Sequence, residues 1–164
     1  LFLLILYLVT MRSRLIVDLA NLLVQRGNPQ PAFSLYKLAL ALRPDNSSRL
    51  IVLVNQGAAH LHQGQIDPAI AILEGVLEEK ERPRLGTKYE AACRYNLGFA
   101  YERKGEDAKA NAQYHQTIDV FPGSIYAQGA QAAIRRRSSI TAIEFWDGSS
   151  APRIVRTLLD FVQS

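Results

Sequence analysis

The sequence predicts an all-α fold, a solenoid of three stacked helix–turn–helix units followed by a capping helix. The clearest unit runs from Tyr95 to Pro122, where apolar residues recur at helical spacing on both sides of a turn at Gly105. One such hairpin cannot bury its apolar faces alone, so a stable fold needs further copies that stack on it. Two copies lie upstream, with turn glycines at Gly27 and Gly64.

The composition is that of an ordinary globular protein. The 164 residues are 48% hydrophobic and 21% charged, which suits one domain with a real core. The net charge of +4 comes from scattered Lys and Arg residues, so we expect no nucleic-acid partner. Cys93 is the single cysteine of the sequence, which excludes a disulfide framework and a cysteine-based metal motif.

The N-terminus carries an unbroken apolar run from Leu1 to Val9, about half of the roughly 20 residues that a membrane span needs. Arg12 and Arg14 follow, as expected on the cytoplasmic side of a membrane helix. Since the chain does not begin with methionine, we expect a fragment or a processed form. Two interpretations stay open. Residues 1–11 are the C-terminal part of a transmembrane anchor, with the remaining domain facing the cytoplasm, or they form an apolar helix packed on the first repeat of a cytoplasmic protein.

Small residues recur in register in the three copies, which we place at about 13–46, 50–83 and 91–124 within a domain of residues 12–137. Seven residues before each turn glycine and five after it, the sequence has a side chain no larger than alanine: Ala20, Gly57 and Gly98 before, and Ala32, Ala69 and Ala110 after. Small residues at these positions let two helices cross closely. In the first copy, the expected buried face consists of Leu15, Ile16, Leu19, Ala20, Leu22 and Leu23.

These features resemble the tetratricopeptide repeat, a helix–turn–helix unit of about 34 residues. Pro44 and Pro122 fall at the end-of-repeat proline of that family, and Pro83 is a displaced version. The tryptophan of the family's first helix is replaced by Ile16, Leu53 and Arg94. The resemblance covers about Arg12 to Pro122. It implies a right-handed α-solenoid whose concave surface, lined by the first helix of each pair, binds an extended peptide or a partner helix.

The phase of the repeats assigns residues to that concave groove. The candidate peptide-binding residues are Asn21, Val24, Val54, Asn55, Ala58, His62, Tyr95, Asn96, Phe99 and Arg103, within a wider inward-facing set that adds Arg14, Val17, Ile51, Leu61 and Ala92. The asparagines either bond a ligand backbone or satisfy their own helix or solvent. Some relatives hold a C-terminal carboxylate with basic residues where Val17 and Val54 stand here. We therefore expect an apolar or helical ligand.

After Pro122, Ser124 is expected to cap a helix that ends at Arg137, with three arginines at its C-terminus, where cations complement the helix dipole. Residues 138–164 read as a polar linker and a short amphipathic helix from Pro152 to Val162, with Ile154, Val155, Leu158, Leu159 and Phe161 on or near one face. That helix either folds back on the repeats, occupies their groove or docks elsewhere.

Catalytic and metal-binding patterns are not found. His60 and His62 are two residues apart, so on a helix they point in different directions and do not chelate one ion. We expect no catalytic residue, no metal and no cofactor. The predicted function is a non-catalytic protein-interaction scaffold at a membrane surface. The alternatives are an accessory domain of a larger membrane protein and self-association of the chain into a homo-oligomer.

Overall fold

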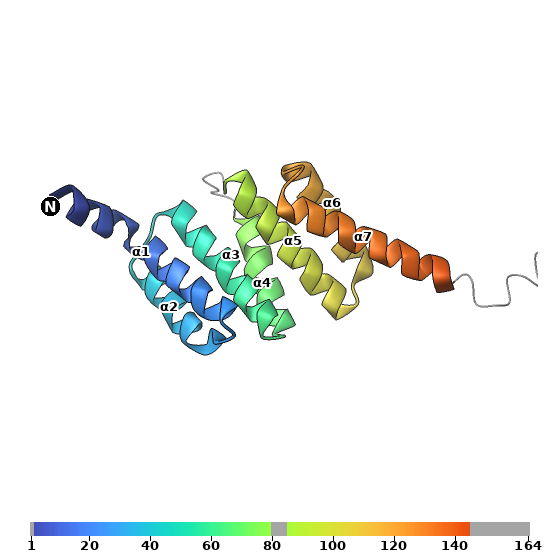
Figure 1. Ribbon diagram of the computed structural model, residues 1–164, viewed down its shortest axis with the longest axis horizontal. Helices are drawn as coiled ribbons and strands as arrows, with labels where there is room; N and C mark the ends of the chain where they lie inside the picture. Colours follow the sequence, from blue (N-terminus) through green and yellow to red (C-terminus); the bar gives the residue numbers. More distant parts are fainter. Residues whose placement is uncertain (1, 80–84, 145–164) are drawn as a thin grey trace, which may run out of the picture.

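The computed structural model describes residues 2–79 and 85–144, and describes side chains within 13–79 and 85–138. All the regular structure in these residues is helical, and it confirms the predicted solenoid of three hairpins and a further helix (Figure 1). The helices stack side by side along the long axis of the molecule. Their bounds are α1 Phe2–Gln25, α2 Pro29–Ala41, α3 Asn46–His62, α4 Ile66–Glu78, α5 Thr87–Lys104, α6 Asp107–Val120 and α7 Ile125–Glu144.

The hairpin turns need glycine because the backbone there is left-handed. Gly27, Gly64 and Gly105 have φ values of +75°, +71° and +80°, a region that other L residues enter at a cost. Gly105 ends α5, and the amide that follows it, from Glu106, donates to the carbonyl of Tyr101 at 2.9 Å. The three turns predicted from the sequence are therefore in place.

The small residues do lie where the two helices of a hairpin cross. A Cβ added at Gly57 would lie 2.8 Å from Leu73 Cδ2, and one added at Gly98 would lie 2.9 Å from the ring of Tyr114. Real Cβ atoms do not approach other atoms so closely, so glycine sets the distance between the helix axes. The alanines in the matching positions of the hairpins are fully buried: Ala20, Ala32, Ala69 and Ala110.

Two hydrophobic clusters form the described core. The larger one joins the second and third hairpins to α7, and includes Leu73, Leu97 and Tyr114. The smaller one holds the first hairpin together around Tyr36 and reaches Val52 and Ala59 of α3. Each hairpin therefore packs mainly on its neighbour, as in a repeat array.

Part of the expected buried face of α1 is exposed, so that prediction is wrong for Leu15, Leu19 and Leu22, whose exposed fractions are 45%, 50% and 40%. Aligning the turn glycines shows the reason. In the third hairpin the equivalent residues Cys93, Leu97 and Ala100 are buried against the hairpin before them. Among the described elements, none stacks on this face of α1, so the three leucines are exposed in the structure.

Helix α7 is longer than the sequence suggested. Ser124 caps it as expected, because its Oγ accepts a hydrogen bond from the amide of Ala127 at 3.1 Å. The helix does not end at the three arginines but continues to Glu144. Two of the three arginines form ion pairs with carboxylates of other helices and do not lie at the C-terminal end of α7. Arg136 bonds Glu102 at 2.6 Å, and Arg137 pairs with Asp107.

Helix α1 runs without a break through the segment predicted as part of an anchor. In the part of the chain that the structure describes, no helix is both long enough and apolar enough to cross a membrane. The anchor hypothesis for residues 1–11 gains no support here and stays a prediction. The predicted helix from Pro152 to Val162 lies outside the described residues.

Candidate protein-binding groove

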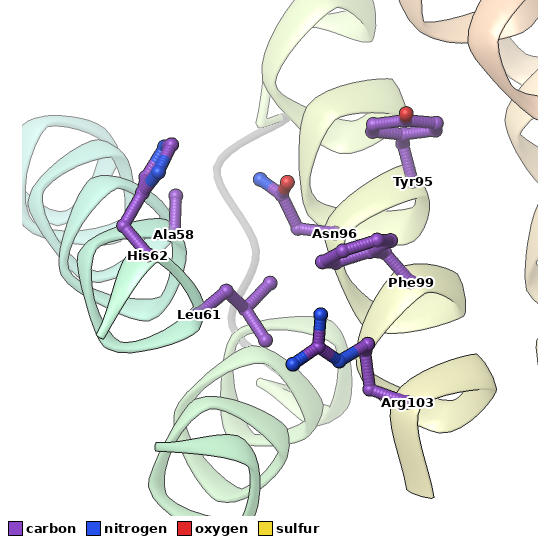
Figure 2. A pocket seen from close by; sticks show the side chains of 7 residues that line it. All are labelled: Ala58, Leu61, His62, Tyr95, Asn96, Phe99 and Arg103. Atoms are coloured by element: carbon purple, nitrogen blue, oxygen red, sulfur yellow. The ribbon is translucent and has the colours of Figure 1, made fainter. Parts of the chain in front are cut away.

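A pocket of about 370 Å³ opens between the first helices of the second and third hairpins, α3 and α5. Figure 2 shows its seven lining side chains, which come from these two helices only. Six of them belong to the ten predicted groove residues, and Leu61 belongs to the wider inward-facing set. They are Ala58, Leu61 and His62 from α3, and Tyr95, Asn96, Phe99 and Arg103 from α5.

Helix periodicity explains why these residues meet. Asn96, Phe99 and Arg103 follow one another at three- and four-residue spacing, so they form one stripe along α5. Their neighbours Leu97 and Ala100 turn into the core, which fixes the direction of the stripe. Helix α3 contacts α5 directly and presents Ala58 and His62 to the same space (Figure 2).

The pocket combines apolar walls with polar groups that solvent can reach. Within the described residues, the side-chain amide of Asn96 has no hydrogen-bond partner and Arg103 has no ion pair. The guanidinium of Arg103 lies over the Phe99 ring, 6.0 Å from its centroid. The lining residues include no carboxylate. The site therefore offers apolar contact, an amide that can donate and accept, and a positive charge.

Tyr95 is a rigid wall of this pocket. Its ring centroid lies 6.0 Å from that of Tyr114 and 6.0 Å from that of Tyr126. The ring also lies over Gly129, where an added Cβ would be 2.9 Å from it. Tyr101 and Tyr114, which we predicted to be core, are 5% and 1% exposed. Tyr95 was predicted to be open to a partner, and it does line the pocket, but one side of its ring belongs to the core.

Four predicted groove residues lie outside the pocket. Val54 is only 3% exposed and packs in the larger core cluster, so the prediction that it lines an open groove is wrong. Val24 packs against the smaller cluster. Because α3 has a hairpin on each side, the strip of it that stays open is narrow. Val17 of α1, from the wider set, is also buried, in the smaller cluster.

The three asparagines of the predicted groove differ in their hydrogen bonds, and whether any of them bonds a ligand stays a prediction. Asn55 bonds its own helix, because its Nδ2 donates to the carbonyl of Ile51 at 2.8 Å. The Oδ1 of Asn21 accepts a hydrogen bond from the hydroxyl of Tyr36 in α2 at 2.7 Å. Asn96 alone of the three keeps its amide unengaged among the described residues.

The groove does not extend across all three hairpins at equal depth. Between α1 and α3 the space shrinks to about 30 Å³, room for about one water molecule. Its lining residues are Ser13, Arg14, Val17, Ser48, Ile51 and Val52. The sequence pattern predicted a continuous groove, whereas the structure concentrates the open volume between α3 and α5.

A second groove, which the sequence did not predict, lies between α6 and α7 and has a volume of about 290 Å³. It is lined by His115, Ile118, Gln131, Ile134 and Arg135. The position of Ile118 opposite α7 depends on how the two helices cross, which the sequence pattern did not give.

The remaining reactive side chains are engaged in packing. Cys93 is fully buried, and its Sγ lies 3.5 Å from the carbonyl of Leu73. The ring of His60 packs on Phe33, with centroids 4.5 Å apart, and its Nδ1 lies 2.6 Å from Gln65 Oε1. Among the described residues, no group of three or more His, Cys, Asp or Glu side chains is arranged to hold a metal ion.

Comparison with known proteins identifies the third hairpin. The family model of the tetratricopeptide repeat matches residues 92–124, which span most of α5 and all of α6. No curated protein matches the chain. Repeats of this family generally are non-catalytic modules for protein–protein interaction. Residues 92–124 are thus similar to a tetratricopeptide repeat, and the all-helical fold around them is consistent with a solenoid of the tetratricopeptide type.

Proposed function

We propose that this chain is a non-catalytic scaffold that holds a peptide or a helix of a partner protein in the pocket between α3 and α5. The observation that carries the proposal is the stripe of Asn96, Phe99 and Arg103 on α5. Its aromatic, amide and guanidinium groups face an open volume of about 370 Å³, and the described residues give the amide and the guanidinium no polar partner.

The chemistry of the pocket indicates the kind of peptide that would fit. Phe99, Tyr95 and Leu61 offer contact to one apolar side chain of a partner. The Asn96 amide suits a backbone peptide group, because it donates and accepts at once. Arg103 lies at one end of the pocket (Figure 2) with no carboxylate among its lining neighbours, which favours an acidic residue beside the apolar anchor.

The test selects ligands on the intact chain and then removes one anchor. Random peptides displayed on phage are selected on the immobilised full chain, and the selected peptides are measured against Phe99→Ala and Phe121→Ala. Phe121 is a matched control, since it is an aromatic side chain that is 39% exposed and does not line the pocket. Loss of a buried aromatic anchor costs more than about 1.4 kcal/mol, which is a tenfold loss of affinity.

We expect Phe99→Ala to weaken binding at least tenfold, whereas Phe121→Ala leaves it unchanged. Arg103→Ala should weaken binding mainly at low salt, because an exposed charge is screened by ions. Selected peptides that bind the Phe99→Ala variant as well as the unchanged chain would place the binding surface elsewhere and refute the proposal.

We also propose that the scaffold works at a membrane surface, with its hairpins facing the cytoplasm. The support is the apolar run Leu1 to Val9 followed by Arg12 and Arg14. The test is fractionation of cells that express the natural protein, with carbonate washing of the membranes. Recovery of the protein in the soluble fraction would refute the proposed membrane tether and would not affect the proposal on the pocket.

A further inference from the structure

Among the described residues, no further helix packs over the groove between α6 and α7, which we call the helix seat. Ile118 of α6 and Ile134 of α7 line it, and both pack on the larger core cluster from the outside. The groove lies away from the pocket between α3 and α5 and shares no lining residue with it.

Helix α7 packs on the third hairpin in the way that α5, the first helix of that hairpin, packs on the second. Near the C-terminal end of α5, Lys104 pairs with Asp67 at the start of α4, at 2.8 Å. In the same way Arg137 of α7 pairs with Asp107 at the start of α6. When the sequences of α5 and α7 are aligned so that Lys104 matches Arg137, the buried residues of the two helices also match: Leu97 with Ala130, and Ala100 with Ala133.

The same alignment explains the groove. It places Gln131, Ile134 and Arg135 of α7 level with Gly98, Tyr101 and Glu102 of α5. All three of those α5 residues contact α6. Gly98 lies against Tyr114, Lys109 Nζ lies 5.1 Å from the centroid of the Tyr101 ring, and Tyr114 donates to Glu102 at 2.6 Å. The three α7 residues of the groove therefore occupy the positions that a second helix would cover.

We propose that residues 152–162 of this chain form that second helix and occupy the groove between α6 and α7. The segment lies outside the described residues, and its sequence is the amphipathic pattern that the seat requires. Ile154, Val155, Leu158, Leu159 and Phe161 lie on or near one face, while Arg153, Arg156 and Asp160 fall on the other.

The segment that joins α7 to residues 152–162 is long enough to let these residues return to the groove. Helix α7 extends from Ile134 to Glu144, about 15 Å at the rise of an α-helix. Residues 145–151 can span up to about 25 Å when extended. A returning helix over residues 152–162 is about 16 Å long, so its last turn reaches back beside Ile134.

The seat differs from those of the other hairpins in one residue. Gly57 and Gly98 allow close crossing, whereas the equivalent residue of α7 is Gln131. The returning helix therefore packs at a greater distance and buries less surface than α4 or α6, which makes its docking weaker and reversible. This inference does not depend on partner binding in the pocket between α3 and α5.

The test uses methyl NMR spectra of the full chain labelled at isoleucine, leucine and alanine, in which Ile118 and Ile134 report on the groove and Ala58 and Leu61 report on the pocket between α3 and α5. Leu158→Asp places a charge on the apolar face of the segment, and Thr157→Asp makes the same charge change on the neighbouring residue outside that face. We expect the Leu158→Asp variant to shift the Ile118 and Ile134 methyl signals, the control to leave them in place, and neither result to depend on protein concentration.

Three results would overturn the proposal. Unshifted Ile118 and Ile134 signals in Leu158→Asp would mean that the segment does not touch the groove. Shifts that vanish on dilution, with a falling molecular mass in sedimentation, would assign the occupant to a second copy. Shifts of Ala58 and Leu61 methyls instead would place the segment in the pocket between α3 and α5. Because the substitution lies outside the repeats, an unchanged circular dichroism spectrum checks that their folding is intact.

Discussion

The matched leucines Leu97 and Leu19 give a direct test of the stacked architecture. They occupy the same register position in the third and first hairpins, but Leu97 is 2% exposed and Leu19 is 50% exposed. Leu97→Ala leaves a cavity in the larger core, and such changes cost about 2–5 kcal/mol. Leu19→Ala removes a side chain that is already half in water and leaves no enclosed cavity, so it should cost about 1 kcal/mol.

The assay is urea unfolding of the two variants and the unchanged chain, followed by far-ultraviolet circular dichroism. Because repeat arrays can unfold in steps, hydrogen exchange of α1 and α5 should accompany it and assign each loss to its hairpin. We expect a large decrease in midpoint for Leu97→Ala, with faster exchange in α5. Equal losses for the two variants would mean that the α1 face is covered like the α5 face, and would refute the stacking argument.

Three further substitutions test the local geometry. Gly98→Ala should destabilise the chain by about 1–3 kcal/mol, because its Cβ would lie 2.9 Å from the Tyr114 ring, whereas Gly75→Ala, on an open face of α4, should stabilise it by about 0.5–1 kcal/mol in thermal melts. Gly105→Ala should cost about 1–2 kcal/mol in the same melts, because its φ of +80° is left-handed. Above pH 10 the free energy of unfolding should fall as pH rises, because burial raises the pKa of Tyr36 to about 12.

The sign of the pH effect follows from the proton count. Between the ordinary tyrosine pKa of about 10 and the raised value, the folded chain keeps a proton that the unfolded chain has lost. The stabilisation is therefore complete below pH 10 and disappears as pH approaches 12. Tyr36→Phe should make the pH profile flatter without removing its slope, because burial also raises the pKa values of Tyr101, Tyr114 and Tyr126. An identical slope in the Phe variant would contradict the burial argument.

Two stability results would contradict the geometry described for the glycines. If Gly98→Ala is as stable as Gly75→Ala, the two helices of the third hairpin do not cross as closely as described. If Gly105→Ala costs nothing, the turn has another conformation in solution. Gly86→Ala is the control for Gly105→Ala. Gly86 directly precedes α5, its own φ is −52°, and an added Cβ would meet no atom within 4 Å.

Local features of the fold were readable from the sequence because glycine and small residues carry specific geometric meaning. Gly105 marks a left-handed turn and Gly98 marks a close crossing, and both are visible without knowledge of neighbouring helices. The exposure of Leu19 was not readable, because it depends on whether another element stacks on α1. The end of α7 was also missed, since side-chain partners of Arg136 and Arg137 come from residues about 30 positions away.

The predicted groove residues on α5 all line one pocket, whereas those on α1 and two of the four on α3 lie outside it. The stripe of Asn96, Phe99 and Arg103 follows from helix periodicity alone. Val54 was misassigned because its helix lies between two hairpins, and a rotation of one residue decides between groove and core. The narrowing between α1 and α3 and the groove between α6 and α7 depend on how helices cross, which no local pattern encodes.

Chemical-shift mapping tests the central claim most directly. A peptide selected on the full chain is titrated into labelled protein, and the amide and methyl signals that move are placed on the structure. We predict that the largest shifts cluster on Ala58, Leu61, Asn96 and Phe99, the facing sides of α3 and α5. Shifts that cluster instead on the second helices α4 and α6, with Asn96 and Phe99 unmoved, would contradict the claim that the pocket between α3 and α5 holds the partner.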